Sequence, residues 1–275
     1  MLRLAIRVRR EDAELVLAEL LELAPGGVEE VELGDAIEYA VYGAPGELPA
    51  LPDLRAAAGA ALVEVSTSEI DDDWAERWRE FHKPLVLDGV LTVRPPWEPP
   101  VTTPIDVIID PGQAFGTGAH ASTRLCLELM LDLARGDAGP GGALLDLGCG
   151  SGVLGIVAAR LGWAPVVAVD HDAASVQAAQ ANAVVNGVSL DVRRLDLRTD
   201  RLPVAPTVAA NLLSPLLIAG APRIAAVQPR QVIASGILVP EADAVAEAFA
   251  AHGLTVGAHR TRGEWTALLL DRAAA

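Results

Sequence analysis

The sequence has few cysteines and few aromatic residues, and it has no long hydrophobic run. Its two cysteines, Cys126 and Cys149, have the spacing of neither a metal site nor a disulfide framework, so we expect no metal and a reducing, cytoplasmic environment. Charged residues interrupt the apolar pattern of the N-terminal stretch, which is untypical of a signal peptide. No run reaches membrane-spanning length, and we expect no membrane association.

Basic residues are also scarce, because 21 Lys and Arg stand against 37 Asp and Glu, for a net charge of −16. A surface this negative repels phosphate backbones and anionic lipid, so we expect no direct nucleic-acid partner. It favours a basic partner. Acidity that serves only solubility is the other interpretation.

The first part of the 275-residue chain has the pattern of a small α+β domain. An alternating strand comes first, then a helix-patterned segment and three further strand-like segments, at residues 2–8, 11–23, 28–34, 36–43 and 62–70. We predict a ferredoxin-like domain over residues 1–70. Because this region lacks a glycine-rich loop and metal-ligand spacing, we assign substrate recognition to it.

Residues 71–100 are predicted to connect this domain to the remainder of the chain, residues 101–275. The segment begins with three acidic residues suited to a helix N-terminus, places Trp74, Trp78 and Phe81 on one helical face, and ends in a proline-rich stretch. These aromatic residues either pack where the helix meets a domain or contact a substrate.

The most informative stretch runs from Ala143 to Asp170 and predicts a strand, a glycine turn, a helix and a second strand. The first apolar run ends at Asp146, and glycines follow at alternate positions from Gly148. The second run, Val166–Val169, is closed by Asp170, which lies 22 residues after Gly148. This spacing is typical of a nucleoside-binding βαβ unit. Glycines let the backbone approach a ligand, and a carboxylate at the end of the second strand can accept both ribose hydroxyls.

A second dense signal lies in residues 105–135, where the block DPGQAFGTGAH precedes a helix-patterned segment. A glycine loop that leads into a helix N-terminus presents backbone amides, which suit a carboxylate or a phosphate. Ser122 and Thr123 fall in the first turn of the predicted helix. Phe115 either covers a flat ring or belongs to the core, and His120 is either a structural residue or a base.

Strand and helix patterns alternate from about residue 140 onward, which predicts a doubly wound α/β sheet closed by a terminal strand pair. One buried strand ends at Asn211, and Ser214-Pro215 opens the next helix. Ligands of such sheets bind at the carboxyl ends of the strands. The loop at Gly148, Asp170 and Asn211 all fall there.

The segment DLGCGSG (146–152), the acid Asp170 and the strand-terminal Asn211 resemble the class I S-adenosylmethionine-dependent methyltransferases, whose fold is a seven-stranded Rossmann-like sheet with a reversed last strand. More narrowly, DPGQAFGTGAH followed by Ser-Thr, LLDLGCGSGVLGI, NLLSPL and SGIL resemble the methyltransferases of ribosomal protein L11. The connector DDDWAERWREFHKP and the terminal GEWTALLL also match that pattern. The resemblance therefore covers nearly the whole chain.

Two departures from the family pattern keep the side-chain character. Ser122-Thr123 replaces two threonines, and Asn211-Leu212-Leu213 replaces Asn-Ile-Leu. The first domain is too variable for its recognition surface to be transferred residue by residue.

The resemblance implies that Thr123, Gly148, Asp170 and Asn211 bind S-adenosylmethionine and that no metal takes part. It also implies a protein N-methyltransferase that trimethylates lysine side chains and the N-terminal amine of ribosomal protein L11, and we expect a cytoplasmic monomer. Asn211 is the catalytic candidate, because its side-chain oxygen can accept an N–H of the amine and orient the lone pair. Asp146 is predicted to orient the glycine loop.

Other functions stay open at this level. One is a small-molecule or nucleic-acid N-methyltransferase on the same fold, although Leu212 and Leu213 follow Asn211 where base-modifying relatives place a proline and a stacking aromatic. Another is a nicotinamide dehydrogenase, because the glycines from Gly150 to Gly155 match the dinucleotide pattern, but this leaves DPGQAFGTGAH unexplained. A binding protein that kept the fold without catalysis is the third.

Overall fold

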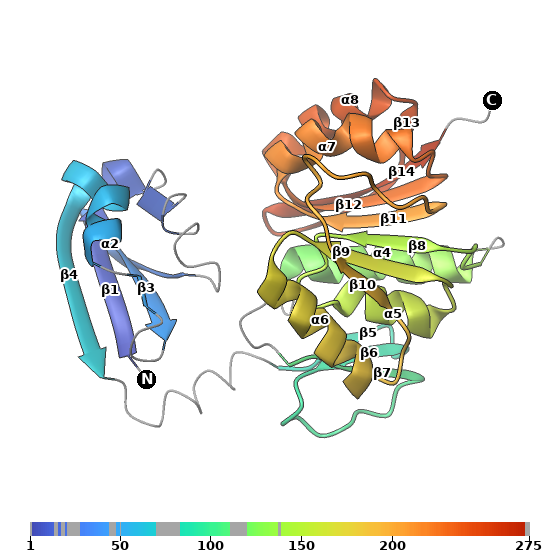
Figure 1. The fold of residues 1–275 in the computed structure, drawn as a ribbon, viewed down its shortest axis with the longest axis horizontal. Helices are drawn as coiled ribbons and strands as arrows, with labels where there is room; N and C mark the ends of the chain where they lie inside the picture. Colours follow the sequence, from blue (N-terminus) through green and yellow to red (C-terminus); the bar gives the residue numbers. More distant parts are fainter. Residues whose placement is uncertain are drawn as a thin grey trace. The chain divides into compact units, whose positions relative to one another are not determined.

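The computed structural model describes residues 2–13, 16–17, 20, 28–43, 48–49, 51–69, 83–110, 120–136 and 139–272. The chain divides into two compact units, Met1–Phe81 and His82–Ala275. Each unit contains its own sheet and its own hydrophobic core (Figure 1). We refer to them as the first and the second unit.

The first unit is built on an antiparallel sheet in the order β2-β3-β1-β4. Along β1, alternation buries Leu4, Ile6 and Val8, while Arg3 and Arg7 on the opposite face form ion pairs with Glu38. The strands lie where the sequence pattern predicts them, but the helix expected over residues 11–23 lies mostly outside the described residues. Its described elements are β1 (Leu2–Arg9), η1 (Arg10–Asp12), β2 (Glu29–Leu33), β3 (Ala36–Gly43), α2 (Leu51–Ala58), η2 (Gly59–Ala61) and β4 (Leu62–Glu69).

The second unit begins with a small sheet in the order β5-β6-β7, formed by Leu85–Leu87, Leu91–Arg94 and Ile105–Ile108. The sequence interpretation assigned residues 71–100 to a connector. Residues 83–100 instead supply β5 and β6 to the second unit, because Leu87 and Leu91 are buried in its core. Residues 70–82, with the three aromatic side chains of the predicted connector helix, lie outside the described residues.

The main sheet of the second unit has seven strands in the order β10-β9-β8-β11-β12-β14-β13. Neighbours from β10 to β12 run parallel, and β14 runs antiparallel to both β12 and β13. This confirms the predicted doubly wound sheet and its terminal strand pair. The strands are β8 (Leu144–Leu147), β9 (Val166–Asp170), β10 (Asp191–Arg194), β11 (Thr207–Asn211), β12 (Gln231–Leu238), β13 (Leu254–Arg262) and β14 (Trp265–Arg272).

Helices cover both faces of this sheet (Figure 1). Side chains of α4, α5 and α6 pack in the core on one face, and those of α7 and α8 pack in the core on the other. Alternate residues of the central strands β8, β11, β12 and β14 point to the two cores, so that Leu144 faces the first and Leu145 the second. The helices are α4 (Ala121–Arg135), α5 (Val153–Leu161), α6 (Ala173–Val185), α7 (Ser214–Ala226) and α8 (Ala242–Ala250), with a 3₁₀ turn η3 (Val239–Glu241) before α8.

Candidate functional site

Three of the four predicted site residues lie at the carboxyl ends of neighbouring parallel strands. Gly148 follows β8, Asp170 ends β9 and Asn211 ends β11, and these strands are adjacent in the order β9-β8-β11. The fourth residue, Thr123, is buried in the first turn of α4. The parallel topology therefore gathers residues that are far apart in the sequence at one edge of the sheet.

The loop after β8 is attached to the end of β9. The N–H groups of Gly148 and Cys149 both donate to the carbonyl oxygen of Val169, at 2.8 and 3.0 Å. Gly148 has a φ of +74°, which favours glycine, and a Cβ at this position would overlap the side chain of Leu212. The backbone thus favours glycine here, and a larger residue would also force the side chain of Leu212 to move, in addition to the ligand approach that the sequence suggests.

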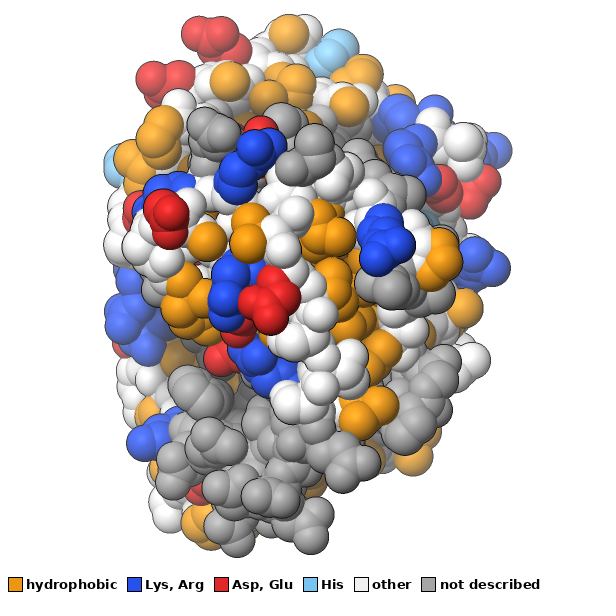
Figure 2. All heavy atoms as spheres, turned by 90° about the vertical axis from the view of Figure 1, so that its left-hand side faces the viewer, with side chains coloured by type: hydrophobic (Ala, Val, Ile, Leu, Met, Phe, Trp, Pro, Cys, Tyr) orange, Lys and Arg blue, Asp and Glu red, His pale blue; other side chains and the backbone are white. Residues whose placement is uncertain are grey.

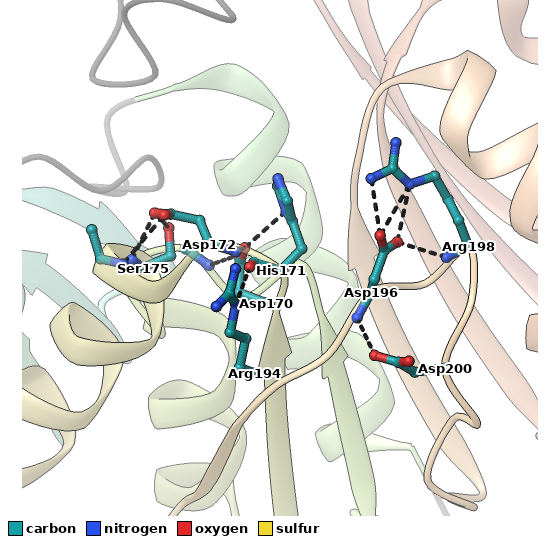
Figure 3. Close-up of polar contacts among 10 residues, drawn as sticks. Asp170, His171, Asp172, Ser175, Arg194, Asp196, Arg198 and Asp200 are labelled. Atoms are coloured by element: carbon teal, nitrogen blue, oxygen red, sulfur yellow. Dashed lines mark hydrogen bonds and ion pairs between the residues drawn. The ribbon is translucent and has the colours of Figure 1, made fainter.

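Asp170 receives backbone hydrogen bonds on both carboxylate oxygens. The N–H of Gly150 donates to Oδ2 at 3.0 Å, and the N–H of Asp172 donates to Oδ1 at 3.0 Å (Figure 3). The Nδ1 of His171 lies 3.3 Å from Oδ1. Because a carboxylate can accept about four hydrogen bonds, Asp170 retains capacity for hydroxyl donors of a ligand.

Further acidic residues lie on either side of Asp170 (Figure 3). Asp172 is the N-cap of α6 and accepts the N–H of Ser175 at 2.9 Å. Asp196, in the segment after β10, is bonded by the side chain of Arg198, which lowers the pKa of this carboxyl group to about 2. Among these three aspartates, Asp170 is the one whose carboxylate joins the glycine loop after β8 to the turn before α6. The sequence analysis did not single out Asp196.

Asn211 and Thr123 are joined directly. The Nδ2 of Asn211 donates to the Oγ1 of Thr123 at 3.2 Å. Among the described residues, none donates a hydrogen bond to the Oδ1 of the half-buried Asn211. The start of α4 is also attached to β12, because the Oγ of Ser235 donates to the carbonyl oxygen of Ser122 at 2.9 Å. This arrangement leaves one acceptor, the Asn211 oxygen, for an external N–H.

His120 has a structural position. It is the N-cap of α4, where its Nδ1 accepts the N–H of Ser122 at 3.3 Å, and its ring lies edge to face with Trp265 at 4.7 Å between centroids. Burial lowers the pKa of His120, which favours the neutral ring and so keeps Nδ1 as an acceptor. Residues 111–119 of the glycine block, including Phe115, lie outside the described residues.

Asp146 lies inside β8 and is fully buried, whereas the sequence pattern places it where the strand breaks into a loop. Its Oδ2 accepts the N–H of Gly155 at 2.8 Å. This bond holds the start of α5, which follows the loop of residues 148–152, called the glycine loop below. Its Oδ1 has no hydrogen-bond partner among the described residues. Burial, together with a smaller effect of the charge of Asp170, raises the pKa of Asp146 to about 7, although the hydrogen bond from Gly155 opposes this rise.

Sequence reasoning missed two buried asparagines, Asn182 in α6 and Asn186 at its C-cap, which hydrogen-bond Asp110 and Ile108 at the end of β7. Asn186 was interpreted only as the end of a helix. The sequence does contain a feature that could have revealed them, because two amide side chains lie one turn apart along an alanine-rich helix. Asparagine is unfavourable there unless its side chain has hydrogen-bond partners.

The described residues contain no group of three or more His, Cys, Asp or Glu side chains placed to hold a metal ion. In the same part of the chain, no helix is both long enough and apolar enough to cross a bilayer.

Comparison with known proteins gives a consistent result. A family model described as "Ribosomal protein L11 methyltransferase (PrmA)" matches residues 52–273. A curated protein named ribosomal protein L11 methyltransferase, from Heliobacterium modesticaldum, is 38% identical over 209 residues, which cover 74% of this chain and 65% of that protein. The protein of the same name from Pelotomaculum thermopropionicum is 41% identical over 211 residues, which cover 74% and 67%. The chain thus spans about two thirds of the length of these relatives.

A solved structure supports the same relationship. The crystal structure of a ribosomal protein L11 methylase from Lactobacillus delbrueckii subsp. bulgaricus superimposes with a TM-score of 0.62 at 27% identity. The superposition covers 70% of this chain and 100% of that one.

Proposed function

The chain belongs to the ribosomal protein L11 methyltransferase (PrmA) family, and from this premise we propose that it transfers methyl groups from S-adenosylmethionine to amines of ribosomal protein L11. The observation that carries the proposal is the meeting of a glycine loop, a hydrogen-bonded carboxylate and a strand-end amide at one edge of the sheet. A nucleoside with an amino-acid tail requires such a mixture of donors and acceptors.

We assign Thr123, Gly148, Asp170 and Asn211 to the cofactor site. Asp170 accepts the ribose hydroxyls in charge-assisted hydrogen bonds worth about 1.5–3 kcal/mol together. The backbone at Gly148 would approach the methionine part of the cofactor. This assignment is supported by the remaining acceptor capacity of Asp170 and by the unpartnered oxygen of Asn211 in the described part of the chain.

The bound cofactor supplies a sulfonium methyl group that is already reactive, so the chain contributes mainly alignment and exclusion of water. Asn211 accepts an N–H of the substrate amine through Oδ1 and orients the nitrogen lone pair. Thr123 holds the Nδ2 end of the same amide, and so keeps the oxygen toward the amine. A lysine amine with a pKa of about 10.4 is mostly protonated at pH 7, so its proton leaves to solvent before transfer.

We further propose that residues 1–70 form a ferredoxin-like recognition domain, that residues 71–100 lead from it into the second unit, where β5 and β6 already pack, and that residues 101–275 carry the catalytic site. The antiparallel order β2-β3-β1-β4 supports the ferredoxin-like assignment. On the face drawn in Figure 2, basic and acidic side chains lie next to each other among hydrophobic ones, which suits a protein partner. The net charge of −16 favours a basic protein over nucleic acid or anionic membrane.

The remaining parts of the proposal follow from the substrate. A ribosomal protein substrate places the activity in the cytoplasm. Repeated transfer to one amine gives trimethylated lysine and a trimethylated N-terminal amine, provided that the amine rotates between transfers. We propose that the chain acts as a monomer.

The test is intact-mass analysis of purified ribosomal protein L11 after incubation with this chain and S-adenosylmethionine. We expect several methyl increments on L11, and none with the Asn211→Ala variant. The chain contains one lysine, Lys83, so methylation of the enzyme itself adds little background. No increment on L11, with cofactor binding established separately, would reject this substrate and favour a small-molecule N-methyltransferase.

A second experiment tests the recognition domain. A variant that lacks residues 1–70 should bind S-adenosylhomocysteine with the affinity of the full chain, which shows that its catalytic part is folded, but should not methylate L11. Retained methylation would place recognition in the second unit.

A further inference from the structure

Two buried asparagines lie one turn apart, Asn182 within α6 and Asn186 as the C-cap of this helix, and both hydrogen-bond the chain at the end of β7. Asn182 is 3% exposed and Asn186 is 4% exposed. The Oδ1 of Asn186 accepts the N–H of Ile108 at 2.8 Å, and its Nδ2 donates to the carbonyl oxygen of Ile108 at 2.6 Å. The Oδ1 of Asn182 accepts the N–H of Asp110 at 3.1 Å. The two amides thus take the place of a neighbouring strand along residues 108–110.

The two asparagines differ in the partner of the side-chain NH₂ group. Its Nδ2 donates to the carbonyl oxygen of Ser151, in the glycine loop, at 2.9 Å. Ser151 is fully buried. One side chain therefore joins the glycine loop to Asp110. In the described part of the chain, the side chain of Asn186 bonds instead to the backbone of Ile108 and to the carbonyl oxygen of Asn182, and its own carbonyl oxygen accepts from the side chain of Arg160.

Other contacts make α6 the support of the glycine loop. A Cβ at Gly152 would lie 2.9 Å from the Cβ of Ala179, so the helix and the loop are in direct contact. At the start of the helix, the N–H of its N-cap Asp172 donates to Asp170. The loop is consequently held from β9 on one side and from α6 on the other.

We propose that Asn182 is a positioning residue for cofactor binding. By fixing the carbonyl of Ser151, it sets the orientation of the peptide units that carry Gly148 and Gly150, and it links this orientation to Asp110. A buried amide with both ends bonded specifies one geometry, because each lost bond leaves an unpaired buried group. The inference rests on the proposed function, which makes this loop the cofactor loop.

Asn186 provides a matched control. It has the same residue type and nearly the same burial as Asn182, lies one turn later as the C-cap of α6, and bonds the last residue of β7. No hydrogen bond joins it to the glycine loop in the described part of the chain. Replacement of either residue by leucine removes the hydrogen bonds and keeps the branching and the number of side-chain heavy atoms. Both full-length variants should lose thermal stability.

The measurements are the dissociation constant for S-adenosylhomocysteine, the KM for S-adenosylmethionine, kcat and Tm. We expect Asn182→Leu to raise the dissociation constant and KM at least tenfold with kcat within threefold. Asn186→Leu should change all three less than threefold, at a similar loss in Tm. The pair Asn182→Ser and Asn186→Ser gives the same comparison if a leucine variant does not fold.

Equal losses of affinity in the two variants, or unchanged affinity in Asn182→Leu at lowered Tm, would overturn the inference, because they indicate a role in stability alone. A wild-type chain that does not bind S-adenosylhomocysteine would overturn the proposed function, and the inference with it.

Discussion

Strands β8 and β9 lie side by side and each carries an aspartate near its carboxyl end, but the two carboxylates are in opposite situations. Asp146 is fully buried within β8, with one oxygen unpartnered in the described part of the chain and a pKa raised to about 7 by burial. Asp170 ends β9 and accepts one backbone N–H on each oxygen. Asp146 lies one residue before the end of its strand and supports the fold, whereas Asp170 is the last residue of its strand and can receive a ligand.

The difference shows why position matters more than residue type at this edge. Inside the sheet, a carboxylate loses its hydration and gains a single donor, from Gly155. At the strand end, the turn into α6 and the glycine loop present their N–H groups, which solvate the charge of Asp170 without using all its acceptor capacity.

The largest expected effect is on the pH dependence of stability through Asp146. The folded-state pKa of about 7 lies above the ordinary value of 3.8, so the native state binds more protons between these values and stability falls as pH rises through this window. Between pH 5 and pH 8 this loss amounts to about 2–3 kcal/mol. Asp146→Asn cannot ionise and should lack this loss. Urea unfolding of both proteins at the two pH values measures it; identical pH dependence would show that Asp146 is not a buried acid of raised pKa.

The next effect is on cofactor affinity through Asp170. Asp170→Asn should weaken binding of S-adenosylhomocysteine roughly 10- to 100-fold, because about 1.5–3 kcal/mol of charge-assisted hydrogen bonding is lost. Asp172→Asn is the control, since it removes the same charge two residues away and asparagine is an equally good N-cap. Calorimetric titration should show a change of less than threefold for the control. If both variants bind equally, Asp170 has no special place in the site.

Gly148→Ala sharpens the comparison at the end of β8. At position 148 the new Cβ has to tolerate a φ of +74° and also overlaps the side chain of Leu212. In the control variant Gly187→Ala the φ is +62°, and no atom lies within 4 Å of the new Cβ. Both should lose about 1 kcal/mol or more for the left-handed backbone, and Gly148→Ala should lose about 1–2 kcal/mol beyond that for the overlap. Chemical denaturation of the two variants gives the difference, and equal losses would argue against the contact with Leu212.

The smallest effect extends the comparison to the third strand end, β11. Thr123→Val removes the acceptor of the Asn211 amide and should cost about 1 kcal/mol in stability. It should also lower kcat several-fold, because the amide is free to turn its N–H₂ toward the amine. Thr123→Ser keeps the hydroxyl and should restore kcat. A serine variant as slow as the valine variant would contradict this role of the hydroxyl group.

The sequence predicted those parts of the structure that local pattern determines. The apolar runs, the glycines after β8 and the acid that closes β9 mark a strand, turn and helix within 30 residues or so, and the structure confirms these elements. The reversed direction of the last strand followed from the family resemblance. Its position between β12 and β13 was not predicted, because pairing between distant strands leaves little trace in local sequence.

Contacts across the fold could not be predicted in this way. The side chain that a Cβ at position 148 would displace belongs to Leu212, and the anchor of the glycine loop comes from Asn182, a residue whose pattern indicates only a helix. Likewise, Leu87 and Leu91 belong to the core of the second unit, although their surroundings resemble a proline-rich connector. These roles depend on which elements pack together, and periodicity does not specify that.

The most direct test of the account is amide hydrogen exchange of the full chain with and without S-adenosylhomocysteine. We predict slower exchange after β8, at the β9–α6 turn and at the β11–α7 turn, in residues 147–152, 169–172 and 211–214, with little change in the first unit. Binding that leaves these three strand ends unprotected, or that protects a different edge of the sheet, would contradict the central claim that the cofactor lies there.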